Sequence, residues 1–121
     1  MLAQRLARRK IILLVESNQA LAKLLHAIIA QRTPHGAVGV STGEEALRVL
    51  GTAIPDLVIL NADLSDMTGA HLCAQIRRVE KLKSLPLLLV GTDRPVEEAL
   101  GLGLPLRLDA FLQALAHLLR A

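Results

Sequence analysis

Three polar side chains follow an apolar run in the segment DLVILNADLSDMTG, residues 56–69: Asn61, Asp63 and Asp66. Polar groups directly after a buried strand form either a site or a turn. A carboxylate such as that of Asp63 is a ligand for hard cations such as Mg²⁺. Asn61 instead carries an amide, whose oxygen is a poor nucleophile and has no charge to help bind a divalent ion. The segment therefore raises the question of what an amide permits at this position.

Apolar runs of strand length alternate with amphipathic segments along the chain. Ser17 or Asn18 is predicted to cap the first helix, and Thr42 with Glu45 to form a capping box before the second. The predicted strands are residues 11–15, 37–40, 54–60 and 85–90, and the helical segments lie within residues 16–32, 41–50, 69–79 and 109–120. Uninterrupted apolar strands between amphipathic helices predict a parallel sheet that is covered on both faces.

In a parallel α/β sheet, ligands bind at the carboxyl ends of the strands, where the strand order reverses. Glu16, Asn61 and Gly91 each follow a predicted strand. We therefore expect these three residues to gather on one rim of the sheet.

The chain of 121 residues predicts one domain, residues 10–121, behind a basic lead-in, residues 1–9. Phe111 is the sole aromatic residue, so stacking on bases is almost excluded. Cys73 is the sole cysteine, and no apolar run is long enough for a signal segment or a membrane span. We expect a soluble cytoplasmic protein of bacterial type. Contact of the basic lead-in with nucleic acid is the less favoured interpretation of its charge.

Four segments together resemble the receiver domain of two-component response regulators, the CheY-like family. They are KIILLVESN, TGEEAL, PDLVILNADLSDMTG and LPLRLDAFLQAL, and the match extends from Lys10 to Arg120. The resemblance implies a flavodoxin-like, doubly wound α/β fold with five parallel strands in the order 2-1-3-4-5. It also implies a phosphoacceptor site built from an aspartate, a pair of acids that hold Mg²⁺, a Ser/Thr and a lysine.

Measured against this family pattern, the site is degenerate. Asn61 stands at the phosphoacceptor position, and of the acidic pair only Glu16 is kept, with Ser17 at the second position. Gly91 replaces the Ser/Thr, although the adjacent Thr92 could partly substitute for it. Leu104 replaces the lysine that would pair with the phosphoryl group. Four losses in one small site predict a receiver that is not phosphorylated.

The two acids of the loop after Asn61 have more modest interpretations. Asp63 is either a solvated loop acid or, together with Glu16, a weak metal ligand. Asp66 is predicted to be a turn residue, with Met67 under the loop and Gly69 at the start of a helix. No cofactor is expected.

Only thirteen residues separate Gly91 from Pro105, and they must supply a loop, a crossover helix and the fifth strand. We therefore predict a shortened fourth helix of about one and a half turns, from Pro95 to Leu100. In receiver domains this region is the usual output surface. Its leucines are Leu100, Leu102, Leu104 and Leu106, and they are predicted to meet a protein partner or a second copy of the chain in a weak homodimer. The alternative is that the last helix and its loop close over them.

The resulting hypothesis is a pseudo-receiver that serves as a protein-protein interaction module in signalling and is not an enzyme. The alternative is an atypical regulator that is switched by a weakly bound metal or small ligand at the rim. His26, His35, His71 and His117 are scattered along the chain and form no ligand pattern.

Overall fold

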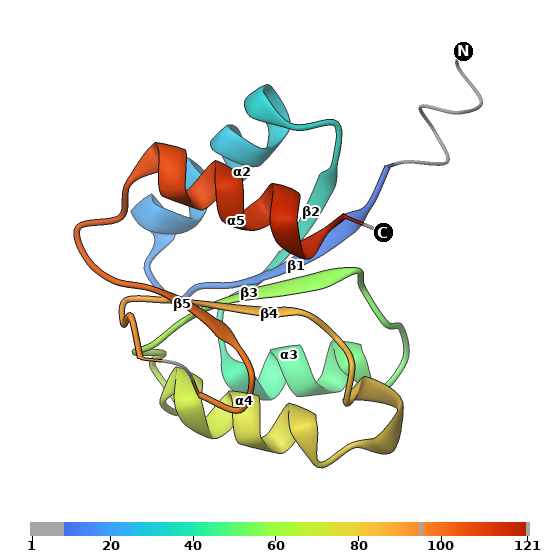
Figure 1. Cartoon of the computed structure of the whole chain (residues 1–121). Helices are drawn as coiled ribbons and strands as arrows, with labels where there is room; N and C mark the ends of the chain where they lie inside the picture. The colour runs from blue at the N-terminus through green and yellow to red at the C-terminus, as the bar shows by residue number, and fades with distance from the viewer. Residues whose placement is uncertain (1–8, 95, 121) are drawn as a thin grey trace.

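The computed structural model describes residues 9–94 and 96–120, in which a five-stranded parallel sheet lies between two layers of helices (Figure 1). The strand order is β2-β1-β3-β4-β5. The strands are β1 (Ile11–Val15), β2 (Gly36–Val40), β3 (Leu57–Asn61), β4 (Leu87–Val90) and β5 (Leu100–Leu102). The helices are α2 (Gln19–Arg32), α3 (Gly43–Leu50), α4 (Gly69–Arg77) and α5 (Leu108–Leu118), with a short 3₁₀ helix η1 (Glu80–Leu82). This architecture confirms the predicted fold class.

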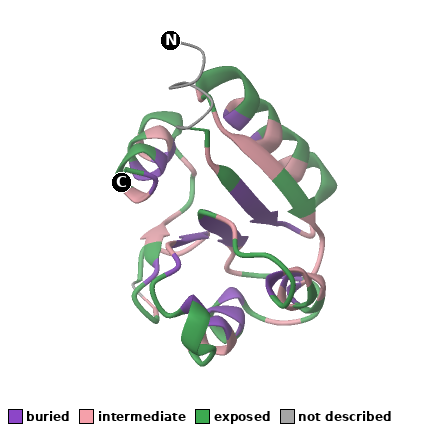
Figure 2. Cartoon of the chain, turned by 90° about the vertical axis from the view of Figure 1, so that its right-hand side faces the viewer, coloured by how far each residue is buried: buried purple, intermediate pink, exposed green. Residues whose placement is uncertain are grey.

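The two helical layers bury separate apolar clusters, because successive strand residues point to opposite faces of the sheet. In β3, Val58 and Leu60 belong to the cluster under α3 and α4. Leu57 and Ile59 belong to the cluster under α2 and α5, around Phe111. The inner strands are therefore buried on both faces, as their apolar sequences predict (Figure 2).

Two helix starts form as the sequence predicts, with one difference in detail. The Asn18 side chain accepts a hydrogen bond from Leu21 N (2.9 Å) and caps α2. The Thr42 hydroxyl accepts from Glu45 N (3.1 Å) and caps α3. The Glu45 carboxylate reaches back to Ser41 N (3.3 Å), so the return bond goes to the residue before the cap.

The predicted helix between β4 and β5 does not form in the described residues, and Pro95 lies outside them. In its place, residues 96–99 form a tight turn in which Ala99 N donates to Val96 O (2.8 Å). Glu97 and Glu98 have φ values of 50° and 62°, so the turn uses two left-handed residues. β5 begins directly after this turn. The reason is length, because a crossover that contains a helix needs at least about 10–12 residues before the next strand.

Arg77 at the end of α4 holds this short connection in place. Its Nε donates to Glu97 O (2.8 Å), and its Nη1 donates to Leu82 O (3.1 Å) and Leu85 O (2.7 Å). One guanidinium group thus ties α4, the segment before β4 and the turn before β5 together.

The basic lead-in lies outside the described residues except for Arg9, so its role stays a prediction. Within the described part of the chain, no helix is long and apolar enough to cross a membrane.

Candidate functional site

A hydrogen-bonded pair, Glu16 and Asn61, forms the centre of the candidate site at the carboxyl ends of β1 and β3. Glu16 is only 4% exposed. Its Oε1 accepts a hydrogen bond from Asn61 Nδ2 (2.7 Å), and its Oε2 accepts from Asn18 N (3.0 Å). Both oxygens of the buried carboxylate therefore have a donor, as a buried charge requires.

The amide of Asn61 uses both of its ends. While Nδ2 binds Glu16, Oδ1 accepts a hydrogen bond from Asp63 N (2.9 Å) and so shapes the start of the β3–α4 loop. A carboxylate has no donor to offer Glu16, and two carboxylates at this separation would repel each other. The amide at position 61 therefore permits a direct hydrogen bond between the two side chains, with no cation needed between them.

Ser17 joins three loops of the rim. Its hydroxyl donates to Ser41 O and accepts from Ser65 N (3.0 Å). Of the two caps proposed for α2, the structure has Asn18, so Ser17 is free of that role and instead links the loops that follow β1, β2 and β3.

Gly91 closes β4 beside the central pair. A side chain built at Gly91 would start 3.2 Å from Ala62 Cβ and 3.6 Å from Asn61 Oδ1. The backbone at Gly91 has φ of 110°, which disfavours any residue with a side chain. The neighbouring Thr92 accepts a hydrogen bond from Arg94 N (3.2 Å), so its hydroxyl is used within the β4–β5 connection.

Asp63 and Leu104, both predicted as site residues, contribute little to the centre. The side chain of Asp63 is exposed, and the bond that it makes to Asn61 comes from its main chain. Leu104 is 72% exposed in the loop after β5. Across residues 9–94 and 96–120, no group of three or more His, Cys, Asp or Glu side chains is arranged to hold a metal ion.

Asp66 has a role that the sequence analysis missed. Its two carboxylate oxygens accept hydrogen bonds from Gly43 N (2.9 Å) and Glu44 N (3.0 Å), the first amides of α3. These bonds lower the pKa of Asp66 below its usual value. The predicted turn is present, but its acid caps a helix that begins 23 residues earlier. An acid in a turn is too common a signal to reveal a partner so distant in the chain.

The four leucines predicted as a contact surface divide into two pairs. Leu104 is 72% and Leu100 38% exposed. Leu102 and Leu106 are half-buried and pack against the apolar cluster under α2 and α5. We call Leu100, Leu104 and the exposed part of Leu102 and Leu106 the leucine surface; its role in binding stays a prediction.

Comparison with known protein families matches residues 12–106 to the response regulator receiver domain. Among curated proteins, the chain is 34% identical over 95 residues to the alkaline phosphatase synthesis transcriptional regulatory protein PhoP of Bacillus subtilis (strain 168). The match covers 78% of the chain and 39% of PhoP, so the chain spans about two-fifths of the length of this relative.

Two solved structures illustrate the likeness in fold. A putative response regulator from Chloroflexus aurantiacus J-10-fl superposes with a TM-score of 0.84 at 21% identity, over 93% of this chain and 99% of that one. The receiver domain of the sensor histidine kinase PA1611 from Pseudomonas aeruginosa PAO1 gives a TM-score of 0.81 at 19% identity, with the same coverage. That domain was solved with a magnesium ion in its active-site cleft.

Proposed function

We propose a function from the premise that this chain belongs to the response regulator receiver domain family, whose place is in two-component signal transduction. Within that family we propose that it is a pseudo-receiver: a module that binds a protein partner and whose output does not depend on phosphorylation.

The hydrogen bond from Asn61 Nδ2 to Glu16 Oε1 carries this proposal. Phosphorylation of a receiver requires a carboxylate oxygen that attacks phosphorus and forms an acyl phosphate. Asn61 presents no such oxygen, because an amide is a poor nucleophile and its Oδ1 already accepts from Asp63 N. The atom of Asn61 that faces Glu16 is the amide nitrogen Nδ2, which carries protons.

The surroundings of the pair support the same conclusion. Mg²⁺ requires near-octahedral oxygen ligands and gives up its water reluctantly. Here the buried Glu16 carboxylate binds two protein donors, and the Ser17 hydroxyl is engaged by Ser41 and Ser65. A cation that binds Glu16 would compete with these hydrogen bonds for the carboxylate oxygens.

The test is incubation of the protein with acetyl phosphate and Mg²⁺, followed by intact mass measurement. We expect an unchanged mass, while a receiver domain with its phosphoacceptor aspartate, treated in parallel, gains one phosphoryl group. We also expect Asn61→Asp to be labelled poorly, because Ser17 and Leu104 still replace the second acid and the lysine. A stable phosphoryl adduct on the unchanged protein would refute the pseudo-receiver.

The alternative, a regulator switched by a weakly bound ion, rests on the acid that the site retains. Glu16 stays at the rim, and the exposed carboxylate of Asp63 follows on the adjacent loop. Titration calorimetry with Mg²⁺ separates the two functions. The pseudo-receiver predicts no binding below millimolar concentrations. Submillimolar binding that Glu16→Ala abolishes would favour the switched regulator.

A further inference from the structure

β2 is an edge of the sheet that no other described strand covers. The strand order ends at β2, which pairs with β1 on its inner side. Within β2, Val38 is 53% exposed and Gly39 is also exposed. The strand reads GAVGV and has no charged residue or proline, the two residue types with which natural proteins usually protect such an edge.

The hydrogen-bond pattern shows which backbone groups of β2 point outward. Gly36 N donates to Lys10 O (3.0 Å), and Val40 O accepts from Glu16 N (3.1 Å), so both residues face β1. In a parallel pair, alternate residues direct their N–H and C=O groups to the same neighbour. Val38 therefore also faces β1 with its backbone, whereas Ala37 and Gly39 direct their N–H and C=O groups away from the sheet.

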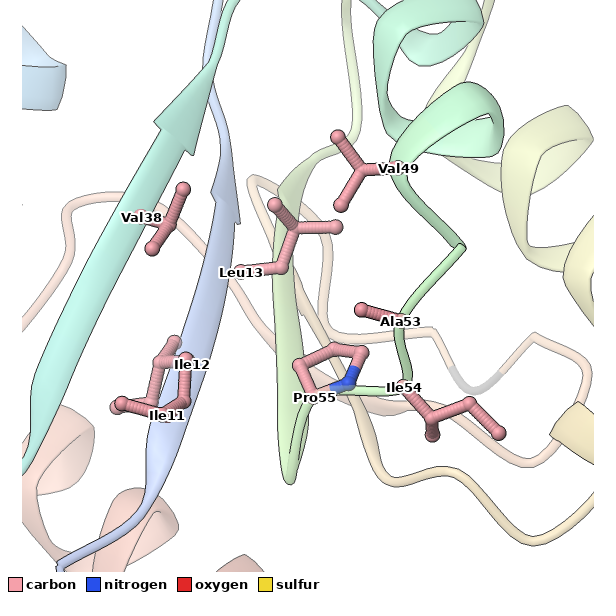
Figure 3. A pocket seen from close by; sticks show the side chains of 8 residues that line it. All are labelled: Ile11, Ile12, Leu13, Val38, Val49, Ala53, Ile54 and Pro55. Carbon is pink, nitrogen blue, oxygen red and sulfur yellow. The ribbon is translucent and has the colours of Figure 1, made fainter. Parts of the chain in front are cut away.

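An apolar hollow lies beside this edge, on the face of the sheet that α3 covers (Figure 3). It has a volume of about 260 Å³, and its lining includes Val38 together with Ile11, Val49, Ile54 and Pro55. Ile11 is 43% and Ile54 is 53% exposed. Exposed apolar surface therefore accompanies the open backbone groups at the same edge.

We propose that β2 is the contact between two copies of this chain, paired antiparallel about a two-fold axis at Val38. The pattern of outward groups fits this pairing, because Ala37 of one copy then exchanges two hydrogen bonds with Gly39 of the other, and Gly39 with Ala37. Val38 lies opposite Val38 of the second copy as a pair without hydrogen bonds, the arrangement in which side chains approach most closely. The two sheets become one, and the two Val38 side chains meet beside the apolar hollows.

Charge favours a second copy as the occupant of this edge. The end of the sheet at which β2 begins carries two exposed basic residues, Arg9 and Arg32, beside one exposed acid, Asp56. The end at which β2 stops carries the exposed acids Glu44 and Asp66, of which Glu44 also pairs with Arg48 of the same helix (3.5 Å). Antiparallel pairing brings the basic end of each copy toward the acidic end of the other. The same two-fold symmetry satisfies the hydrogen bonds, the valine contact and the charges, as an isologous interface requires.

The test uses two variants of the full chain, Val38→Lys and Val38→Glu, in sedimentation equilibrium over a dilution series. The wild type should form a dimer. For each variant alone, the dissociation constant of the dimer should be higher than that of the wild type by at least about tenfold, because like charges then face each other across the axis. An equimolar mixture of the two variants should recover the dimer, since the introduced lysine of one copy then faces the introduced glutamate of the other.

Two controls make the result specific. Leu24→Lys, at a residue that is 54% exposed on α2, should leave the dimer unchanged. Leu104→Glu tests whether the leucine surface is the site of self-association, and this substitution should also leave the dimer unchanged. The proposal is overturned if the wild type stays monomeric, if Leu104→Glu rather than Val38→Lys breaks the dimer, or if the mixture of variants stays monomeric while circular dichroism shows both to be folded. None of these outcomes bears on phosphorylation, so the proposed function is tested separately.

Discussion

At the scale of single residues, the site is defined by one neutral side chain beside one buried acid. Asn61 donates to Glu16 and accepts from the main chain of Asp63. The buried charge of Glu16 is thereby compensated by hydrogen bonds from the protein. The amide at position 61 therefore stabilises the buried carboxylate of Glu16.

This arrangement predicts that Asn61→Asp destabilises the protein in the absence of a divalent cation. The substitution removes the donor to Glu16 and places a second carboxylate 2.7 Å away at the same contact. We expect a loss of about 1–3 kcal/mol in the free energy of unfolding at pH 7, measured by urea denaturation.

Addition of Mg²⁺ should restore part of the stability of Asn61→Asp and leave the wild type nearly unchanged, since only the variant offers two adjacent carboxylates. An Asn61→Asp protein as stable as the wild type without Mg²⁺ would show that the hydrogen bond from the amide to Glu16 does not stabilise the protein.

Asp66 predicts a pH dependence of stability. Hydrogen bonds from Gly43 and Glu44 lower its pKa in the folded protein, so its contribution is fully present above its unfolded pKa of about 4 and is lost as the pH falls through the lower folded value. Asp66→Asn should therefore lower the melting temperature at pH 7, and the difference from the wild type should shrink below pH about 4. The matched control is Asp63→Asn, which changes an exposed acid of the same loop. A difference that is constant with pH would mean that the charge of Asp66 is not what stabilises α3.

At the scale of elements, the β4–β5 connection departs most from the expected pattern. A tight turn replaces the expected helix, and Arg77 anchors it by a hydrogen bond to Glu97 O. The turn contains two glutamates in the left-handed region, where a residue with a side chain is disfavoured. The connection is therefore both short and conformationally strained.

This strain predicts that Glu98→Gly stabilises the fold. Glycine adopts a φ of 62° without steric cost, and part of the gain is offset by the greater freedom of glycine in the unfolded chain. We expect a net gain of about 0.5–1 kcal/mol in the free energy of unfolding, measured by urea denaturation. Glu80→Gly, at an exposed glutamate in η1 that is outside the left-handed region, should instead destabilise. If both variants destabilise, the turn does not carry the strain that its φ values indicate.

At the scale of the whole molecule, the two edges of the sheet offer separate surfaces. β2 ends the sheet on one side, and β5 with the leucine surface ends it on the other. A dimer through β2 leaves both leucine surfaces free for protein partners. Burial of apolar side chains there would contribute about 25 cal/mol per Å², less the entropic cost of association.

This separation predicts that partner binding is lost on substitution of Leu104, the most exposed leucine of the leucine surface. In pull-downs with the chain as bait, a partner captured by the wild type should be absent with Leu104→Glu and retained with Leu24→Glu, a matched exposed leucine on α2. It should also be retained with Val38→Lys. A partner that binds all three variants equally would place the output surface elsewhere on the molecule.

The sequence by itself determined the order of the first four strands and of helices α2, α3, α4 and α5, the rim at which Glu16 and Asn61 meet, and the amide at position 61. These features follow from local periodicity, from helix caps such as Thr42 and from residue chemistry, all of which act over a few neighbouring positions.

Only the tertiary structure decided which groups those residues bind and where the short crossover turns. The Asn61–Glu16 bond joins residues 45 positions apart, and Asp66 caps a helix from a different loop. The turn at Glu97 and Glu98 depends on β5 pairing with β4, which leaves too few residues for a helix. The half-burial of Leu102 and Leu106 likewise depends on where α5 packs. Such contacts arise from folding of the entire chain, and no local sequence pattern indicates them.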